Sequence, residues 1–73
     1  MRASVHNPRD LGRVIRRVRE QHSLTQRELA DRLSVSQRYL SELENGRPKI
    51  ADERYFDLLR LLGLTMTVQT SDE

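Results

Sequence analysis

Two helix-start signals only eleven residues apart, at Thr25 and Ser36, constrain this chain more than any other feature. Thr25 precedes Glu28 by three residues, the spacing of a capping box, in which each side chain binds the other residue's backbone amide. Ser36 is a second N-cap residue. Signals this close allow only short helices, which we expect over 26–33 and 37–44. Such helices cannot bury their apolar faces alone, so they must pack on other helices.

The flanking segments supply those other helices. Asn7 suits an N-cap and Pro8 suits the first helical position, and the apolar spacing that follows predicts a helix over 8–22. A fourth helix is predicted over 51–62. In the first helix the helical spacing runs through Leu11, Ile15, Val18 and His22, and Val14 widens the stripe. In the later helices the residues of the apolar faces are Leu29, Ala30, Leu33, Leu40, Leu43, Tyr55, Phe56, Leu58, Leu59 and Leu62. The sequence therefore predicts an all-α bundle of four main helices in a domain over 7–63.

The last segment changes its period. Leu64, Met66 and Val68 alternate with polar residues, which is typical of a strand, here over 64–70. A lone strand leaves its backbone donors and acceptors unsatisfied. Its partner is either the same strand of a second molecule, which would make 64–70 a dimerisation strand, or the weak segment 2–6. Residues 71–73 are expected to fray.

Composition excludes several classes of protein. Cysteine is absent, so there is neither a disulfide nor a thiolate metal site, and His6 and His22 lack a ligand spacing. We expect no metal and no cofactor. The chain offers no Ser-His-Asp set and no glycine-rich phosphate loop, and it is too short to enclose a catalytic pocket, so we do not expect an enzyme. Without a signal peptide or an apolar run of about 20 residues, a cytoplasmic location is expected.

Charge is unevenly spread and dominated by arginine. The formal net charge is +2, and of 13 basic residues only Lys49 is lysine. Arginine binds phosphate and guanine edges in a planar, bidentate way, which suits nucleic acid. An arginine-rich composition also occurs in proteins from GC-rich genomes. Charge alone therefore favours nucleic-acid binding without deciding it.

The second short helix has a polar outer face, because Leu40 and Leu43 take the inner one. The residues expected to contact bases are Gln37, Arg38, Ser41 and Glu42. Glutamine can pair with adenine and arginine with guanine, whereas a glutamate can accept from cytosine or hold an arginine in place. Phosphate contacts are expected from helix N-termini and nearby cations. The residues expected to make them are Gln26, Arg27, Ser36, Tyr39, Arg47 and Lys49.

The run Leu-Thr-Gln-x-x-Leu-Ala, then Val-Ser-Gln, then Leu-x-x-Leu-Glu-Asn-Gly resembles the Cro-type, lambda-repressor-like helix-turn-helix family of the XRE regulators, over about 8–63. The resemblance implies double-stranded DNA as partner, with Gln26 on phosphate and Gln37, Arg38 and Glu42 facing the bases. It also implies a buried ion pair between Arg19 and Glu44. The turn position that the family usually fills with glycine is Ser34 here, which would be strained at positive φ.

The ending Leu62-Gly-Leu-Thr-Met-Thr-Val and the Asn-Pro-x-x-Leu opening are similar to HipB-type antitoxins. That resemblance implies a homodimer joined through the terminal strand. It also implies repression of the protein's own operon at a near-palindromic operator and binding to a HipA-type serine/threonine kinase toxin. Two alternatives stay open: a stand-alone or phage-type repressor, and a protein-interaction module that has lost DNA readout.

Overall fold

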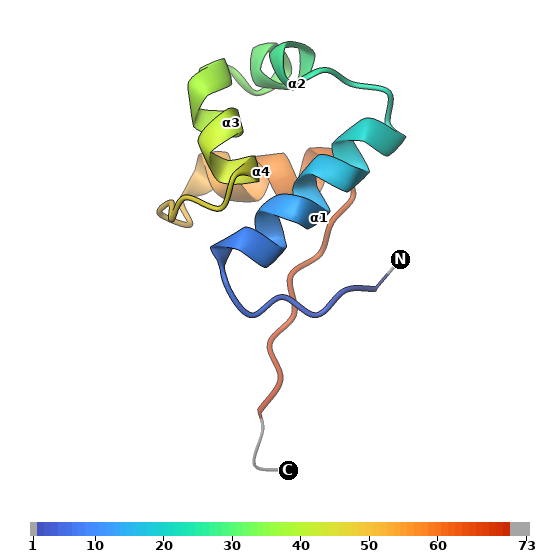
Figure 1. The fold of residues 1–73 in the computed structure, drawn as a ribbon, viewed down its shortest axis with the longest axis vertical. Coiled ribbons are helices and arrows are strands. Elements are labelled where there is room, and N and C mark those ends of the chain that lie inside the picture. Colours follow the sequence, from blue (N-terminus) through green and yellow to red (C-terminus); the bar gives the residue numbers. More distant parts are fainter. Residues whose placement is uncertain (1, 71–73) are drawn as a thin grey trace.

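The structure, a computed structural model, describes residues 2–70. These residues form four helices (Figure 1). Their bounds are α1 Pro8–Gln21, α2 Gln26–Leu33, α3 Gln37–Glu44 and α4 Glu53–Leu61. The predicted all-α helix-turn-helix bundle is confirmed. In Figure 1, α2 and α3 lie at one end, α1 crosses in front of α4, and the C-terminal segment runs away from the bundle.

Helix boundaries follow the caps. The Ser36 hydroxyl accepts from the Tyr39 amide at 3.0 Å, and both bonds of the Thr25–Glu28 capping box form, at 3.0 and 2.9 Å. The predicted bounds of α2 and α3 are therefore confirmed. The fourth helix was expected to start at residue 51, but it starts at Glu53 because the Asp52 carboxylate caps it, accepting from the Tyr55 amide at 3.2 Å. It ends at Leu61 and α1 at Gln21, each one residue earlier than expected.

Each of the four described helices is followed by a residue with positive φ. These residues are Ser23, Ser34, Gly46 and Gly63. After α2, the Val35 amide donates to the Ala30 carbonyl at 3.0 Å, which is the long bond of a Schellman motif. Ser34 thus occupies a left-handed position with φ 57°, and Ser23 does so as well. A Cβ in this region costs about 1–2 kcal/mol, so both turns carry local strain.

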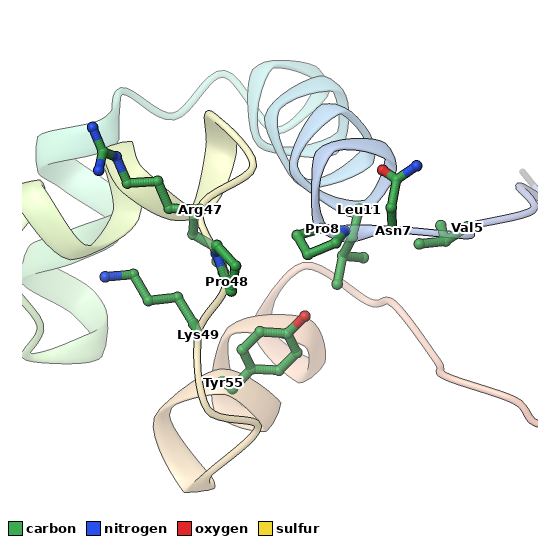
Figure 2. Close-up of a pocket in the computed structure, with 9 residues that line it drawn as sticks. Val5, Asn7, Pro8, Leu11, Arg47, Pro48, Lys49 and Tyr55 are labelled. Atoms are coloured by element: carbon green, nitrogen blue, oxygen red, sulfur yellow. The ribbon is translucent and has the colours of Figure 1, made fainter.

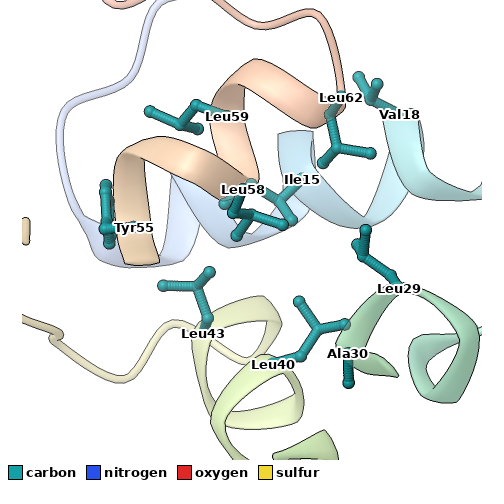
Figure 3. Packing of buried hydrophobic residues seen from close by; sticks show 10 residues of the cluster. All are labelled: Ile15, Val18, Leu29, Ala30, Leu40, Leu43, Tyr55, Leu58, Leu59 and Leu62. Atoms are coloured by element: carbon teal, nitrogen blue, oxygen red, sulfur yellow. The ribbon is translucent and has the colours of Figure 1, made fainter. Parts of the chain in front are cut away.

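The core lies between the four helices (Figure 3). Ile15, Leu29, Leu40 and Leu58 are its fully buried large side chains, one from each helix. The smallest core side chain is Ala30, which lets α2 and α3 approach closely. This packing fixes the angle between α2 and α3, because neither helix can rotate without exposing apolar area worth about 25 cal/mol per Å².

A glycine brings α1 against the end of α3. A Cβ placed on Gly12 would lie 2.5 Å from the Leu43 carbonyl oxygen and 2.6 Å from that of Glu44. Real Cβ atoms do not approach backbone that closely, so only glycine permits this crossing. The contact fixes the position at which α1 crosses the last turn of α3.

The C-terminal segment 64–70 forms neither helix nor strand in the single chain. No backbone hydrogen bond joins residues 2–6 to residues 64–69, so the intrachain pairing that we considered is not formed there. Pairing with a second copy stays a prediction. Residues 71–73, where fraying was expected, lie outside the described residues. Among residues 2–70, no helix has the length and apolarity needed to cross a bilayer.

Candidate nucleic-acid interface

The outer face of α3 is polar and open. Gln37 and Arg38, in its first turn, are exposed, and the Arg38 side chain keeps 86% of its surface. Ser41 and Glu42, one turn on, are half-buried. A helix about 10–12 Å across fits the major groove of B-DNA, where these side chain types can meet base edges. The four residues expected to contact bases therefore share one accessible face.

A buried ion pair fastens α1 to the last turn of α3. Arg19 Nε donates to Glu44 Oε2 at 2.6 Å, and Arg19 Nη2 donates to Glu44 Oε1 at 3.1 Å. The two side chains keep only 9% and 2% of their surface. Arg19 Nη1 also donates to the Leu24 carbonyl at 2.7 Å, so the guanidinium spans three structural segments. The hydrogen bond to Glu44 raises the pKa of Arg19.

The same carboxylate positions the first residue of α2. Gln26 Nε2 donates to Glu44 Oε1 at 3.0 Å, which leaves the amide oxygen and the second amide proton of Gln26 for another partner. Arg27 follows on the exposed side. The start of α2 thus lies beside the end of α3, and its free N–H groups add a positive helix terminus to this surface.

Glu42 is paired with two cations. Its Oε1 accepts from Lys49 Nζ at 2.7 Å, and its Oε2 lies 3.4 Å from Arg38 Nε. The Lys49 ammonium is the main cause that holds the pKa of the Glu42 carboxyl below its usual value. The structure thus pairs Glu42 with a lysine and, more loosely, with an arginine, and a contact between Glu42 and a base stays a prediction.

Tyr39 departs from expectation. We expected a phosphate contact, but the residue keeps only 7% of its surface, and its hydroxyl is buried without a hydrogen-bond partner within residues 2–70. The reason is its spacing: Tyr39 precedes Leu43 by four residues and therefore lies on the core side of α3. Burial raises the pKa of the Tyr39 hydroxyl. In this structure the hydroxyl is out of reach of any phosphate.

The Tyr39 ring is instead a platform for cations. The Lys49 ammonium lies 5.3 Å from the ring centroid, and the Arg54 guanidinium lies 4.4 Å from it. Sequence reasoning did not single out Arg54. The sequence gives little indication of this contact, because Arg54 lies in the first turn of α4 and meets Tyr39 only after the loop between α3 and α4 folds back.

The loop after α3 carries two more of the expected residues. The Arg47 amide donates to the Glu42 carbonyl at 2.9 Å, which turns the chain back along α3. Figure 2 shows the side chains of Arg47 and Lys49 extending to the same side of this loop. Residues 47–49 of this loop also line a cavity of about 200 Å³, together with Pro8, Leu11 and Tyr55 among others. Both cations thus belong to the surface formed by α3.

Among residues 2–70, no three His, Asp or Glu side chains gather closely enough to hold a metal ion. The polar side chains on the surface are amides, hydroxyls, the paired charges of Glu42 with Arg38 and Lys49, and the further cations Arg27 and Arg47. What the arrangement can do is to place donors and acceptors against a groove and cations against phosphates.

Comparison with known proteins identifies relatives of the chain. The family model described as Helix-turn-helix matches residues 15–69. An uncharacterized HTH-type transcriptional regulator of Sinorhizobium fredii, y4mF, is 30% identical over 73 residues, which span 100% of this chain and 96% of the relative. Antitoxin HipB of Escherichia coli is 31% identical over 64 residues, 88% of this chain and 73% of the relative.

The chain is also similar to a chain of a solved structure. The chain superposes on a chain of the structure titled "Structure of HipA-HipB-O2-O3 complex" with a TM-score of 0.80 and 28% sequence identity. The match covers 97% of this chain and 100% of that one. The similarity therefore includes the arrangement of all four helices.

Proposed function

The chain belongs to the helix-turn-helix family of DNA-binding regulators, and from this premise we propose that it is a sequence-specific transcriptional repressor acting as a homodimer on a near-palindromic DNA operator. Its mechanism is steric and performs no chemistry. Two copies of α3 enter successive major grooves, about 34–36 Å apart, and exclude other proteins from the promoter. Such a repressor works where the chromosome is, in the cytoplasm.

The observation that carries this proposal is the outer face of α3. Gln37 and Arg38 project from a helix that the core and the Arg19–Glu44 pair hold rigidly. Rigidity matters because a helix that is already ordered loses little conformational entropy when its side chains bind to bases. Arg38 would form bidentate bonds to a guanine, and Gln37 would pair with an adenine.

Phosphate contacts would flank this face at both ends of α3. Gln26 and Arg27 at the start of α2 lie beside the end of α3, where Arg47 follows in the next loop. Ser36 lies at the start of α3. Each neutralised phosphate releases a counterion, so binding should weaken steeply as salt rises.

We infer further that the protein is the antitoxin of a toxin–antitoxin pair, repressing its own operon and binding a HipA-type serine/threonine kinase. Support comes from the antitoxin HipB, which is similar over 88% of this chain, and from the structure whose title joins HipA with HipB. A pull-down with the tagged full chain from its own organism tests this proposal. Recovery of a kinase-like protein encoded next to its gene supports the antitoxin role, and recovery of none favours a stand-alone or phage-type repressor.

A mobility shift on the DNA upstream of the protein's own gene tests the DNA-binding proposal. An affinity for this DNA that is at least about 10³-fold higher than for an unrelated duplex at physiological salt supports the proposal. The logarithm of the binding constant should fall linearly with the logarithm of the salt concentration. No binding at low salt would instead favour a protein-interaction module that has lost DNA readout.

A further inference from the structure

The Glu42 carboxylate lies on the surface that we assign to DNA, where a free negative charge would oppose binding. Lys49 neutralises it. The 2.7 Å contact links α3 to the loop that follows, and both side chains are largely covered, with 21% and 25% of their surface left. The Lys49 ammonium also lies over the Tyr39 ring, 5.3 Å from its centroid. Lys49 is therefore held in place from two sides.

The contact between Glu42 and Arg38 is much looser. It is 3.4 Å long, joins residues four apart on one helix, and involves an arginine with 86% of its side-chain surface exposed. Pairs of this kind are weak, the more so with the cation on the N-terminal side. Arg38 can therefore leave Glu42 when a base offers a better partner, as long as Glu42 has Lys49.

We propose that Lys49 is a positioning residue that determines base preference, because it occupies Glu42 and thereby leaves Arg38 free to read a base. This inference rests on the proposed DNA-binding function. Without the ammonium, the unpaired Glu42 carboxylate would hold Arg38 more firmly and could itself accept from a cytosine amino group. The preference at one base pair would then change although Lys49 touches no base.

Binding to a set of operator duplexes, each altered at a single base pair, tests the proposal. The informative position is the one at which R38A loses its preference. There, K49M should reduce the preference for the original base by about tenfold, within the usual range of coupling between neighbouring residues. In an E42Q background the same K49M substitution should change the preference by less than about twofold, because the carboxylate that it releases is gone.

R47M is the matched control, since Arg47 extends from the same loop and its hydrogen bond to Glu42 is made by the backbone amide, which the substitution retains. It should weaken binding equally on every duplex and lower the salt slope by about one. If K49M also weakens binding equally on every duplex, both in the wild type and in the E42Q background, Lys49 is a phosphate contact and the proposal is wrong. Thermal melts within a few degrees of wild type establish that K49M is folded.

A measurement without DNA separates this inference from the proposed function. Titration of the Glu42 carboxyl by NMR should give a lowered pKa in the wild type, and K49M should raise it. An unchanged pKa would overturn the inference even if the operator is bound. If the pKa rises but the wild type binds no duplex, the ion pair is real and both the proposed function and the role in base preference are overturned.

Discussion

The guanidinium of Arg19 and the carboxylate of Glu44 form two hydrogen bonds in a site that water hardly reaches, and a third partner, the Gln26 amide, is attached to the same carboxylate. This contact connects α1, α2 and α3. A buried ion pair contributes little net stability against an apolar replacement, because both charges lose their hydration. Its consequence is geometric: it fixes where the start of α2 lies relative to the end of α3.

Glu44→Gln should destabilise the fold by about 3–5 kcal/mol, because it leaves the Arg19 charge buried without a counter-charge. Urea or thermal unfolding followed by circular dichroism measures this loss. The matched control is Glu20→Gln, which breaks the Arg16–Glu20 pair, whose side chains are 63% and 56% exposed. That variant should stay within about 0.5 kcal/mol of wild type. Equal effects of the two substitutions would contradict the role given to Glu44.

Ser34→Gly should stabilise the protein by about 1 kcal/mol, because glycine removes the Cβ that is strained at φ 57°. In a domain of this size the melting temperature should rise by about 4–8 °C. Ser34→Ala is the control, since it retains the Cβ and should bring no gain. A glycine variant that melts at or below the wild-type temperature would show that the turn is unstrained.

The helices could be predicted because their signals are local. The Thr25–Glu28 capping box and the Ser36 cap fix the starts of α2 and α3 from neighbouring residues alone, and the apolar period gives their inner faces. The ends of α1 and α4 were each predicted one residue too late, and after α1 the left-handed residue is Ser23. Nothing in the residue type of Ser23 requires positive φ, which arises because the Leu24 amide returns to the Arg19 carbonyl.

The surface was predicted less completely, because its details depend on residues brought together by the loop after α3. Glu42 and Lys49 are seven residues apart, which in a continuous helix would separate them by about 10 Å along the axis. They meet only because the chain turns back at Gly46. Tyr39 was assigned to the surface, although its place four residues before Leu43 puts it on the core side. Arg54, which covers the Tyr39 ring, comes from another helix altogether.

Tyr39→Phe tests the corrected position of this residue. The hydroxyl is buried without a partner, so removing it should leave stability unchanged or raise it by about 1 kcal/mol. The aromatic ring, and with it the contacts to Lys49 and Arg54, is retained. Thermal melts measure stability, and a mobility shift should give unchanged operator affinity. A clear loss of affinity in the folded variant would show that the hydroxyl reaches a phosphate after all.

Arg38→Ala should weaken operator binding by about 1–3 kcal/mol and relax the base preference at one position, as expected for an arginine that reads a guanine. The truncation should not affect folding, because the side chain is largely exposed and its contact with Glu42 is weak. Competition between operator duplexes altered base by base provides the measurement. Arg60→Ala, on α4, serves as a control and should leave the preference unchanged. Equal loss on operator and random duplex would mean that Arg38 only contacts phosphate.

Removal of residues 64–73 should convert a dimer into monomers and sharply weaken operator binding, since one half-site alone captures little of the affinity of two. Sedimentation equilibrium measures the oligomeric state. Point variants identify the face that pairs: along an alternating strand, Met66 and Val68 point to one side and Thr67 to the other. Met66→Lys should then dissociate the dimer, whereas Thr67→Lys should leave it intact. A truncated chain that stays dimeric would place the interface on the helices, and the apolar alternation of this segment would then need another explanation.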